Sequence, residues 1–108
     1  MSFEVDTIPN FEREAKRLKK KYSSLKNELT LLIEELENNP LQGTPLKNSF
    51  YKIRLSIKSK GKGKRGGARV ITLVKVVAQK VYLVSIYDKS EQSDIDEAEL
   101  GRIILELT

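Results

Sequence analysis

The chain has 108 residues and a mass of 12.3 kDa, the size of a single domain with one hydrophobic core, so we expect one domain over residues 1–108. Its 20 Lys and Arg residues outnumber its 15 Asp and Glu residues, and the formal net charge of +5 favours an anionic partner. Because His and Cys are both absent, disulfides, Cys nucleophiles, Ser-His-Asp triads and the ligands of most zinc and copper sites are excluded.

The N-terminal residues carry no sign of export. Residues 1–6 lack a basic n-region and an apolar h-region, and no apolar run approaches the ~20 residues of a membrane span. We therefore expect a cytoplasmic protein with no membrane contact. Catalysis, if present, must use Lys, Arg, Tyr, Asp or Glu, and we expect no metal or other cofactor.

A short strand at residues 3–5 precedes the first predicted helix. Apolar residues recur at steps of three and four from Phe11 to Tyr22, which is the spacing of one helix face. Thr7 or Asn10 is the expected N-cap. The opposite face is basic, and acidic neighbours favour a solvated surface over a second phosphate site.

Ser23 and Ser24 interrupt this pattern and can cap a second helix. Its apolar stripe runs from Leu25 to Leu36, and residues 38–40 end it. So short a link between two helices predicts an antiparallel hairpin, whose apolar stripes must pack on the strands that follow.

Residues 41–48 contain Gly and Pro and indicate a loop. From residue 50 to residue 57 the apolar period changes to two, which predicts a strand. Lys52 and Arg54 lie on the face opposite the apolar one and therefore point the same way.

Two further strands complete a three-stranded meander. A hairpin at 59–67, rich in Gly and Lys, leads into residues 69–74, which are apolar on both faces as in a central strand. The last strand is predicted at 81–87, after a turn at 78–80.

Capping-box patterns at Ser93 and Asp94 predict the start of a last helix, with an apolar stripe from Ile95 to Leu107. The element order β-α-α-β-β-β-α gives an α+β domain. We expect an antiparallel sheet with two N-terminal helices packed on it and a C-terminal helix.

Residues 38–87 contain eleven Lys or Arg and no acid. On charge alone, the loop at 58–65 fits a solubilising hairpin tip as well as an RNA-binding surface. Lys52 and Arg54, with Arg69 on the adjacent strand, favour phosphate binding, because converging cations are costly unless an anion arrives. The candidate RNA-binding residues are Lys58, Lys60, Lys62, Lys64, Arg65 and Tyr51.

Such a set of cations can cleave RNA without a metal. The adjacent 2′-hydroxyl would be the nucleophile, a desolvated Lys could take its proton, and guanidinium groups would stabilise the charge that develops on the phosphate. Tyr51 and Tyr87 could stack on bases, although Tyr in strands is also common packing.

Four segments, residues 11–22, 51–55, 62–71 and 81–91, resemble the RelE/ParE toxin superfamily in the same order. The resemblance is nearest to the RelE/HigB-like toxins of bacterial type II toxin–antitoxin systems. It implies a ribosome-dependent mRNA endonuclease, or mRNA interferase, that inhibits translation. The catalytic candidates that it implies are Lys52, Arg54, Arg69, Lys89 and Tyr87.

Two residues depart from the family pattern. Arg54 stands where RelE proper has the Lys proposed as base, and because a guanidinium stays protonated, that role would pass to Lys52. Ile95 occupies a region where family enzymes often have Tyr or His, and Tyr87 is the candidate substitute. The alternative is a non-catalytic protein of the same fold, either a ParE-like gyrase inhibitor or a degenerate RNA-binding toxin.

The resemblance also implies partners. These are mRNA, the ribosome and a cognate antitoxin, expected to be a small helix-turn-helix protein. An acidic or amphipathic segment of that antitoxin would cover the cationic groove near Arg54 and Arg69.

Overall fold

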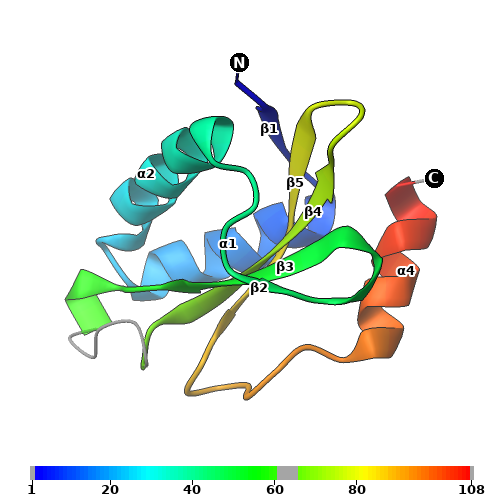
Figure 1. Ribbon diagram of the computed structural model, residues 1–108. Coiled ribbons are helices and arrows are strands. Elements are labelled where there is room, and N and C mark those ends of the chain that lie inside the picture. The colour runs from blue at the N-terminus through cyan, green and yellow to red at the C-terminus, as the bar shows by residue number, and fades with distance from the viewer. Residues whose placement is uncertain (1, 61–65, 108) are drawn as a thin grey trace.

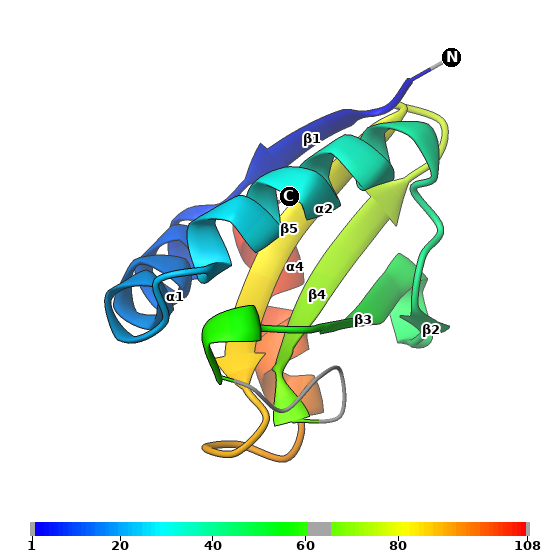
Figure 2. The same cartoon turned by 90° about the vertical axis from the view of Figure 1, so that its left-hand side faces the viewer.

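A five-stranded sheet forms the centre of the structure, with α1 and α2 on one side and α4 on the other (Figures 1 and 2). The computed structural model describes residues 2–60 and 66–107. The strands are β1 (Glu4–Thr7), β2 (Thr44–Pro45), β3 (Phe50–Leu55), β4 (Ala68–Lys75) and β5 (Lys80–Asp88). The helices are α1 (Pro9–Lys21), α2 (Leu25–Asn38) and α4 (Glu97–Leu107), with 3-10 turns at Lys47–Ser49 and Lys58–Lys60.

The strand order is β1-β5-β4-β3-β2, and the prediction of an α+β domain with this succession of helices and main strands is confirmed. The antiparallel meander of β3, β4 and β5 is as predicted, but the sheet as a whole is mixed, because β1 pairs with β5 in parallel, which corrects the prediction of an antiparallel sheet. The prediction missed β2, since two residues show no period and Pro weakens a strand signal.

The short strand β2 covers only part of the outer edge of β3. Thr44 pairs with Lys52 and Pro45 pairs with Tyr51, and the described chain places no other strand beside this edge. Gly43 enters β2 with φ +92°, and a Cβ there would collide with the carbonyl of Lys52. Glycine therefore lets β2 lie close against β3.

The core lies where the predicted apolar stripes meet the sheet. Phe11, Ala15 and Leu18 of α1 are buried, as is the α2 stripe from Leu25 to Leu36. Every residue of β4 except Lys75 is buried, which confirms the central strand. None of the helices that the structure describes has the length and apolar character needed to cross a membrane.

Two helix starts differ from the prediction. Ile8, not Thr7 or Asn10, is the N-cap of α1, because Pro9 takes the first helical position and its missing N–H needs no partner. The last helix begins at Glu97, later than the capping-box pattern suggested. Asp96 accepts a hydrogen bond from the Ala98 backbone N–H at 3.0 Å, so Asp96 caps α4.

A buried carboxylate ties three distant segments together. Asp88, at the end of β5, is fully buried and forms an ion pair with Lys60, which follows β3. Tyr22, at the end of α1, donates its hydroxyl proton to Asp88 at 2.5 Å, and Ser90 donates at 2.7 Å. Burial alone would raise the pKa of Asp88, but these hydrogen bonds outweigh it and hold the pKa well below its usual value.

Asp88→Asn should lower the free energy of unfolding at neutral pH by about 3–5 kcal/mol, because the Lys60 ammonium would stay buried without its counter-charge. The pKa of Asp88 is lower in the folded chain than in the unfolded chain. Its stabilisation is therefore full above the unfolded pKa of about 3.9 and is lost as the pH falls toward the folded pKa. Urea unfolding at neutral and acid pH measures both effects.

The matched control is Glu91→Gln, which breaks the exposed ion pair between Arg17 and Glu91 at 2.9 Å. An exposed pair is worth about 1 kcal/mol or less, so this variant should remain close to the wild type. Equal losses in the two variants would contradict a special role for Asp88.

Candidate functional site

Cations from three parts of the chain line one cleft of about 440 Å³. We call it the basic cleft, and its lining residues are Thr44, Lys52, Arg54, Arg69, Lys89 and Ser93. Four of the six are Lys or Arg and none is acidic. The structure thus brings together the four cations that the sequence singled out as catalytic candidates.

Strand register explains why these side chains converge. Arg54 on β3 lies directly opposite Arg69 on β4, which lies opposite Tyr87 on β5. Side chains at directly opposite positions point to the same face of a sheet. Lys52 lies two residues before Arg54 and shares that face.

Arg54 and Arg69 have different surroundings within this row. Arg69 is only 5% exposed, and its guanidinium donates to the carbonyl of Ala68 at 3.1 Å. Arg54 is exposed, and none of the ion pairs formed by the described residues includes it. Like charges directly opposite each other destabilise a sheet, so this row costs stability.

The segment between β5 and α4 closes one side of the basic cleft. Lys89 donates to the carbonyl of Ser93 at 3.0 Å, and Lys52 lies 3.3 Å from the Asp94 carboxylate. The hydroxyl of Tyr87 donates to the same Asp94 oxygen at 3.4 Å. Sequence reasoning treated Asp94 only as a helix cap, and no local signal could reveal a contact with a residue 42 positions away.

Two pKa shifts follow from these contacts. Burial, and then the nearby Asp94 carboxylate, raise the pKa of the Tyr87 hydroxyl to about 12. A hydrogen bond from the Ile95 backbone N–H, followed by the contacts with Lys52 and Tyr87, lowers the pKa of Asp94. Asp94 is therefore a carboxylate at neutral pH and Tyr87 keeps its proton.

The other predicted residues are more dispersed. Lys58 is exposed, Tyr51 is half-buried against the core, and Tyr87 is only 3% exposed. The side chain of Lys60 is 7% exposed and its ammonium is held by Asp88. Lys62, Lys64 and Arg65 lie outside the described residues.

Ile95, at the position that departs from the family pattern, lies outside the basic cleft. It is half-buried and lines a separate, mainly apolar cleft between α4 and the start of β3, together with Phe50 and Leu100. Among residues 2–60 and 66–107, no group of three or more acidic side chains is arranged to hold a metal ion.

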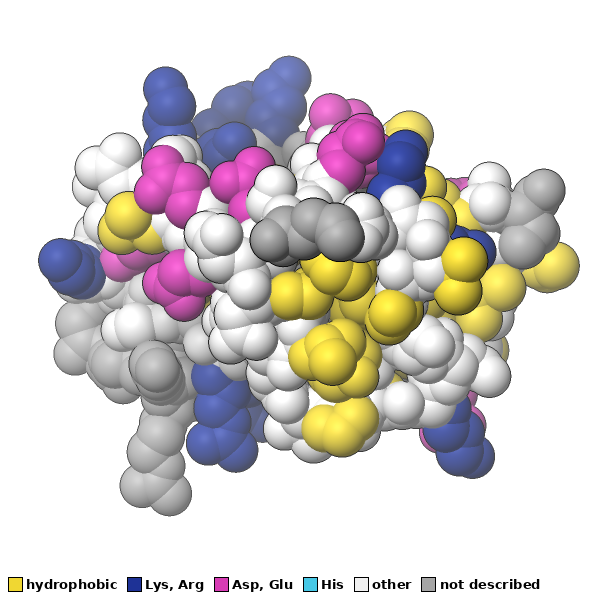
Figure 3. Space-filling model, turned by 45° about the horizontal axis from the view of Figure 1, so that its top comes forward, with side chains coloured by type: hydrophobic (Ala, Val, Ile, Leu, Met, Phe, Trp, Pro, Cys, Tyr) yellow, Lys and Arg dark blue, Asp and Glu magenta, His cyan; other side chains and the backbone are white. Residues whose placement is uncertain are grey.

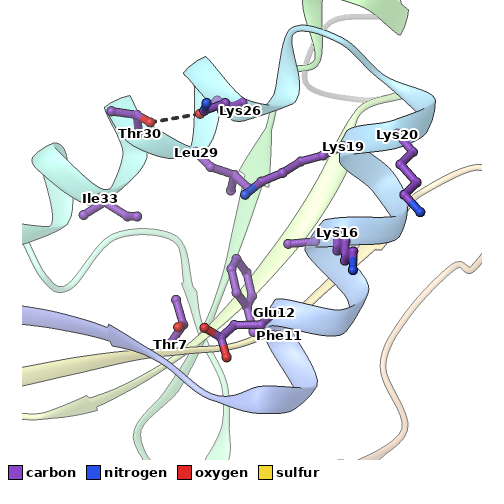
Figure 4. A pocket seen from close by; sticks show the side chains of 11 residues that line it. Thr7, Phe11, Glu12, Lys16, Lys19, Lys20, Lys26, Leu29, Thr30 and Ile33 are labelled. Atoms are coloured by element: carbon purple, nitrogen blue, oxygen red, sulfur yellow. Dashed lines mark hydrogen bonds between the residues drawn. The ribbon is translucent and has the colours of Figure 1, made fainter.

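A further cleft separates α1 from α2 (Figure 4). Its floor is apolar and includes Phe11, Leu29 and Ile33, whereas Lys residues stand around it. The cations are Lys16, Lys19, Lys20 and Lys26, and the acid is Glu12. Figure 4 shows Lys19 extending from α1 toward α2.

Exposed hydrophobic side chains form another surface feature. Figure 3 shows them gathered near the centre and at one side of the face in view, with basic side chains mainly around its rim. The large hydrophobic residues that are more than half exposed, among those described, are Leu31, Leu41, Val76, Val77 and Leu105.

Comparison with known proteins gives a consistent result. A family model described as the RelE toxin of the RelE/RelB toxin–antitoxin system matches residues 10–104. The RelBE2 toxin–antitoxin complex of Mycobacterium tuberculosis contains a similar chain, with a TM-score of 0.60 and 15% identity over 87% of this chain and 95% of that one.

Two E. coli structures are also similar. A doubly substituted toxin RelE in the free state has a TM-score of 0.58 and 20% identity, covering 86% of this chain and 90% of that one. The intact RelBE toxin–antitoxin complex gives a TM-score of 0.56 and 20% identity, covering 81% and 96% of the two chains. At these identities the structural likeness supports the fold.

Arg54→Gln should raise the free energy of unfolding by about 0.2–1 kcal/mol, because it removes one of two cations that lie opposite each other. Urea or thermal unfolding of the purified variant measures the gain.

Lys75→Gln is the matched control, since Lys75 also lies opposite a cation, Lys80. Lys80 already has carboxylate partners at 3.4 and 3.6 Å, so the repulsion there is partly offset and the gain should be smaller. A loss of stability in Arg54→Gln would show that repulsion between Arg54 and Arg69 does not destabilise the sheet.

Proposed function

The chain belongs to the RelE toxin family of toxin–antitoxin systems, and from this premise we propose that it cleaves mRNA on the ribosome and thereby inhibits translation. The observation that carries the proposal is the basic cleft, where Lys52, Arg54, Arg69 and Lys89 converge. The reaction would use the RNA 2′-hydroxyl and no metal.

The energetics of the cleft support an anionic substrate. Arg54 and Arg69 repel each other across two paired strands, and an RNA phosphate between them would convert repulsion into attraction. Because Arg69 is buried in the central strand, its guanidinium is held in place before the substrate arrives. A preorganised cation of this kind stabilises charge that develops in the transition state.

The remaining RNA contacts lie along the chain that leaves β3. Lys58 is exposed and fits a phosphate contact, and we propose the same role for Lys62, Lys64 and Arg65. We leave Lys60 out because its ammonium is already held by Asp88. Tyr87 is too buried to stack on a base, and Tyr51, next to Lys52 in β3, points to the opposite face of the sheet and packs against the core, so we give neither a stacking role.

Expression of the wild type in bacteria should arrest growth and fragment translated mRNA. The double variant Arg54→Gln, Lys89→Gln removes two cleft cations, so cleavage should fall at least about 100-fold. RNA sequencing of transcript ends measures cleavage. Lys47→Gln, Lys75→Gln removes the same charge outside the cleft and is the control.

The rival function is gyrase inhibition by a ParE-like protein, and plasmid supercoiling read in the same cells tests it. We expect cut mRNA with unchanged supercoiling. Altered supercoiling with intact mRNA would contradict mRNA cleavage and support gyrase inhibition. Intact mRNA with unchanged supercoiling would leave a degenerate toxin that only binds RNA.

We propose that a cognate antitoxin of the helix-turn-helix class restrains the toxin. The cleft between α1 and α2 offers a second contact besides the basic cleft, because its apolar floor and its Lys residues match an acidic amphipathic segment (Figure 4). The basic face of α1, expected from sequence to be only solvated, would then contribute to partner binding.

Lys16→Glu, Lys19→Glu should slow association with the antitoxin encoded beside this chain by about tenfold or more, since charges at a rim act mainly on the encounter rate. Stopped-flow association at several salt concentrations should show a weaker salt dependence in the variant. Lys75→Glu, Arg102→Glu changes the charge equally on other elements and serves as the control. Equal slowing by both double variants would mean that net charge alone guides the encounter.

A further inference from the structure

Asp94 lines the mainly apolar cleft next to the basic cleft and reaches the basic cleft through its contact with Lys52. Its Oδ1 accepts hydrogen bonds from the Lys52 ammonium at 3.3 Å, the Tyr87 hydroxyl at 3.4 Å and the Ile95 backbone N–H at 2.9 Å. Within the described chain all of its side-chain hydrogen bonds end on Oδ1, so Oδ2 is left for another donor. The side chain is 63% exposed and open to a ligand.

Cleavage through a 2′-hydroxyl needs a group that takes a proton and a group that gives one. The guanidinium groups of Arg54 and Arg69 stay protonated and cannot take it. Lys52, the base expected from sequence, lies 3.3 Å from the Asp94 carboxylate and donates a hydrogen bond to it, so Lys52 is the donor of this pair. Asp94 is the acceptor in its contacts with Lys52 and Tyr87, and its Oδ2, which takes no hydrogen bond within the described residues, is placed to accept a proton.

We propose that Asp94 is the general base of RNA cleavage and that Lys52 is the general acid; this assignment rests on the proposed function. Oδ2 of Asp94 takes the proton of the 2′-hydroxyl, and the 2′-oxygen attacks the adjacent phosphorus. The bond from phosphorus to the 5′-oxygen breaks, and the leaving oxygen takes a proton from Lys52. The products are a 2′,3′-cyclic phosphate and a 5′-hydroxyl.

The ion pair between Lys52 and Asp94 can be regenerated after each reaction. After one reaction Asp94 is protonated and Lys52 is neutral, and the two groups lie 3.3 Å apart. Once the carboxyl group of Asp94 turns its protonated oxygen toward Lys52, proton transfer to the amine regenerates the resting pair without a separate acid or base. Arg54, Arg69 and Lys89 stabilise the charge on the phosphate during the reaction.

Tyr87 is a positioning residue in this mechanism. Its hydroxyl, with a pKa of about 12, stays protonated and donates to Oδ1, which helps to hold the carboxylate at the edge of the cleft. The Ile95 backbone N–H donates to the same oxygen. Tyr87 on β5 and the backbone N–H of Ile95 thus hold the Asp94 carboxylate in place, and Lys52 on β3 contacts the same oxygen.

The alternative is that Asp94 is only a counter-ion that competes with the RNA phosphate for Lys52. The two roles predict opposite effects of Asp94→Asn. Loss of a base slows cleavage, whereas loss of a competitor leaves cleavage unchanged or faster.

The experiment is single-turnover cleavage of mRNA bound to ribosomes, together with RNA affinity measured on the same proteins. Asp94→Asn should reduce the cleavage rate at least about 100-fold, with RNA affinity unchanged or higher. Asp96→Asn is the matched control, because Asp96 lies in the same segment but caps α4, and it should cleave like the wild type. Asp94→Glu should regain part of the lost rate.

A modified substrate separates the acid from the base. When the bridging 5′-oxygen is replaced by sulfur, the leaving thiolate needs no proton, because a thiol has a pKa of only about 8.5. Lys52→Met should be slow on normal RNA and recover on the sulfur substrate, whereas Asp94→Asn should stay slow on both.

Cleavage by Asp94→Asn at the wild-type rate or faster would overturn the assignment of the base. Failure of the sulfur substrate to rescue Lys52→Met would overturn the assignment of the acid. If the wild type itself leaves mRNA intact, the proposed function falls, and the assignment falls with it.

Discussion

The buried carboxylate of Asp88 constrains the geometry on which the basic cleft depends. It accepts hydrogen bonds from Tyr22 at the end of α1 and from Lys60 in the 3-10 turn that follows β3. Neighbours in a strand point to opposite faces, so fixing Asp88 toward the helices directs Tyr87 to the face of the sheet that carries Arg69. The buried ion pair between Lys60 and Asp88 thus helps to orient the side chain of Tyr87. The geometry of the candidate site therefore depends on contacts made in the core.

The cleft illustrates how a protein can hold an unfavourable arrangement of charge. Arg69 lies on β4, the most buried strand, and cannot move away from Arg54 without breaking the sheet. Apolar packing of β4 against both layers of helices supplies the stability that opposes this repulsion. Binding energy is then not spent on ordering Arg69, since folding has already ordered it.

Much of the fold could be predicted because its signals are local. The steps of three and four from Phe11 to Tyr22 and the alternation around Lys52 specify a helix and a strand by themselves. The position of Arg69 beside Arg54 followed from adjacent strands pairing. What the sequence could not reveal depends on distant contacts: the parallel pairing of β1, and the partners of Asp88 and Asp94. The sequence also gives no sign that Lys60, in a segment rich in Gly and Lys, is buried while its neighbour Lys58 is exposed.

Because β2 pairs with only two residues of β3, the rest of that strand edge affects how the protein behaves in solution. Beyond Lys52, no strand among residues 2–60 and 66–107 pairs with the outer side of β3, and an unpaired strand edge is a template on which identical chains can assemble edge to edge into aggregates. Arg54 lies on this part of β3, and its charge makes the approach of a second copy repulsive. The same guanidinium that suits a phosphate therefore also keeps the molecules apart. Neutralising it to silence the toxin would yield a more stable monomer that is also more prone to self-association.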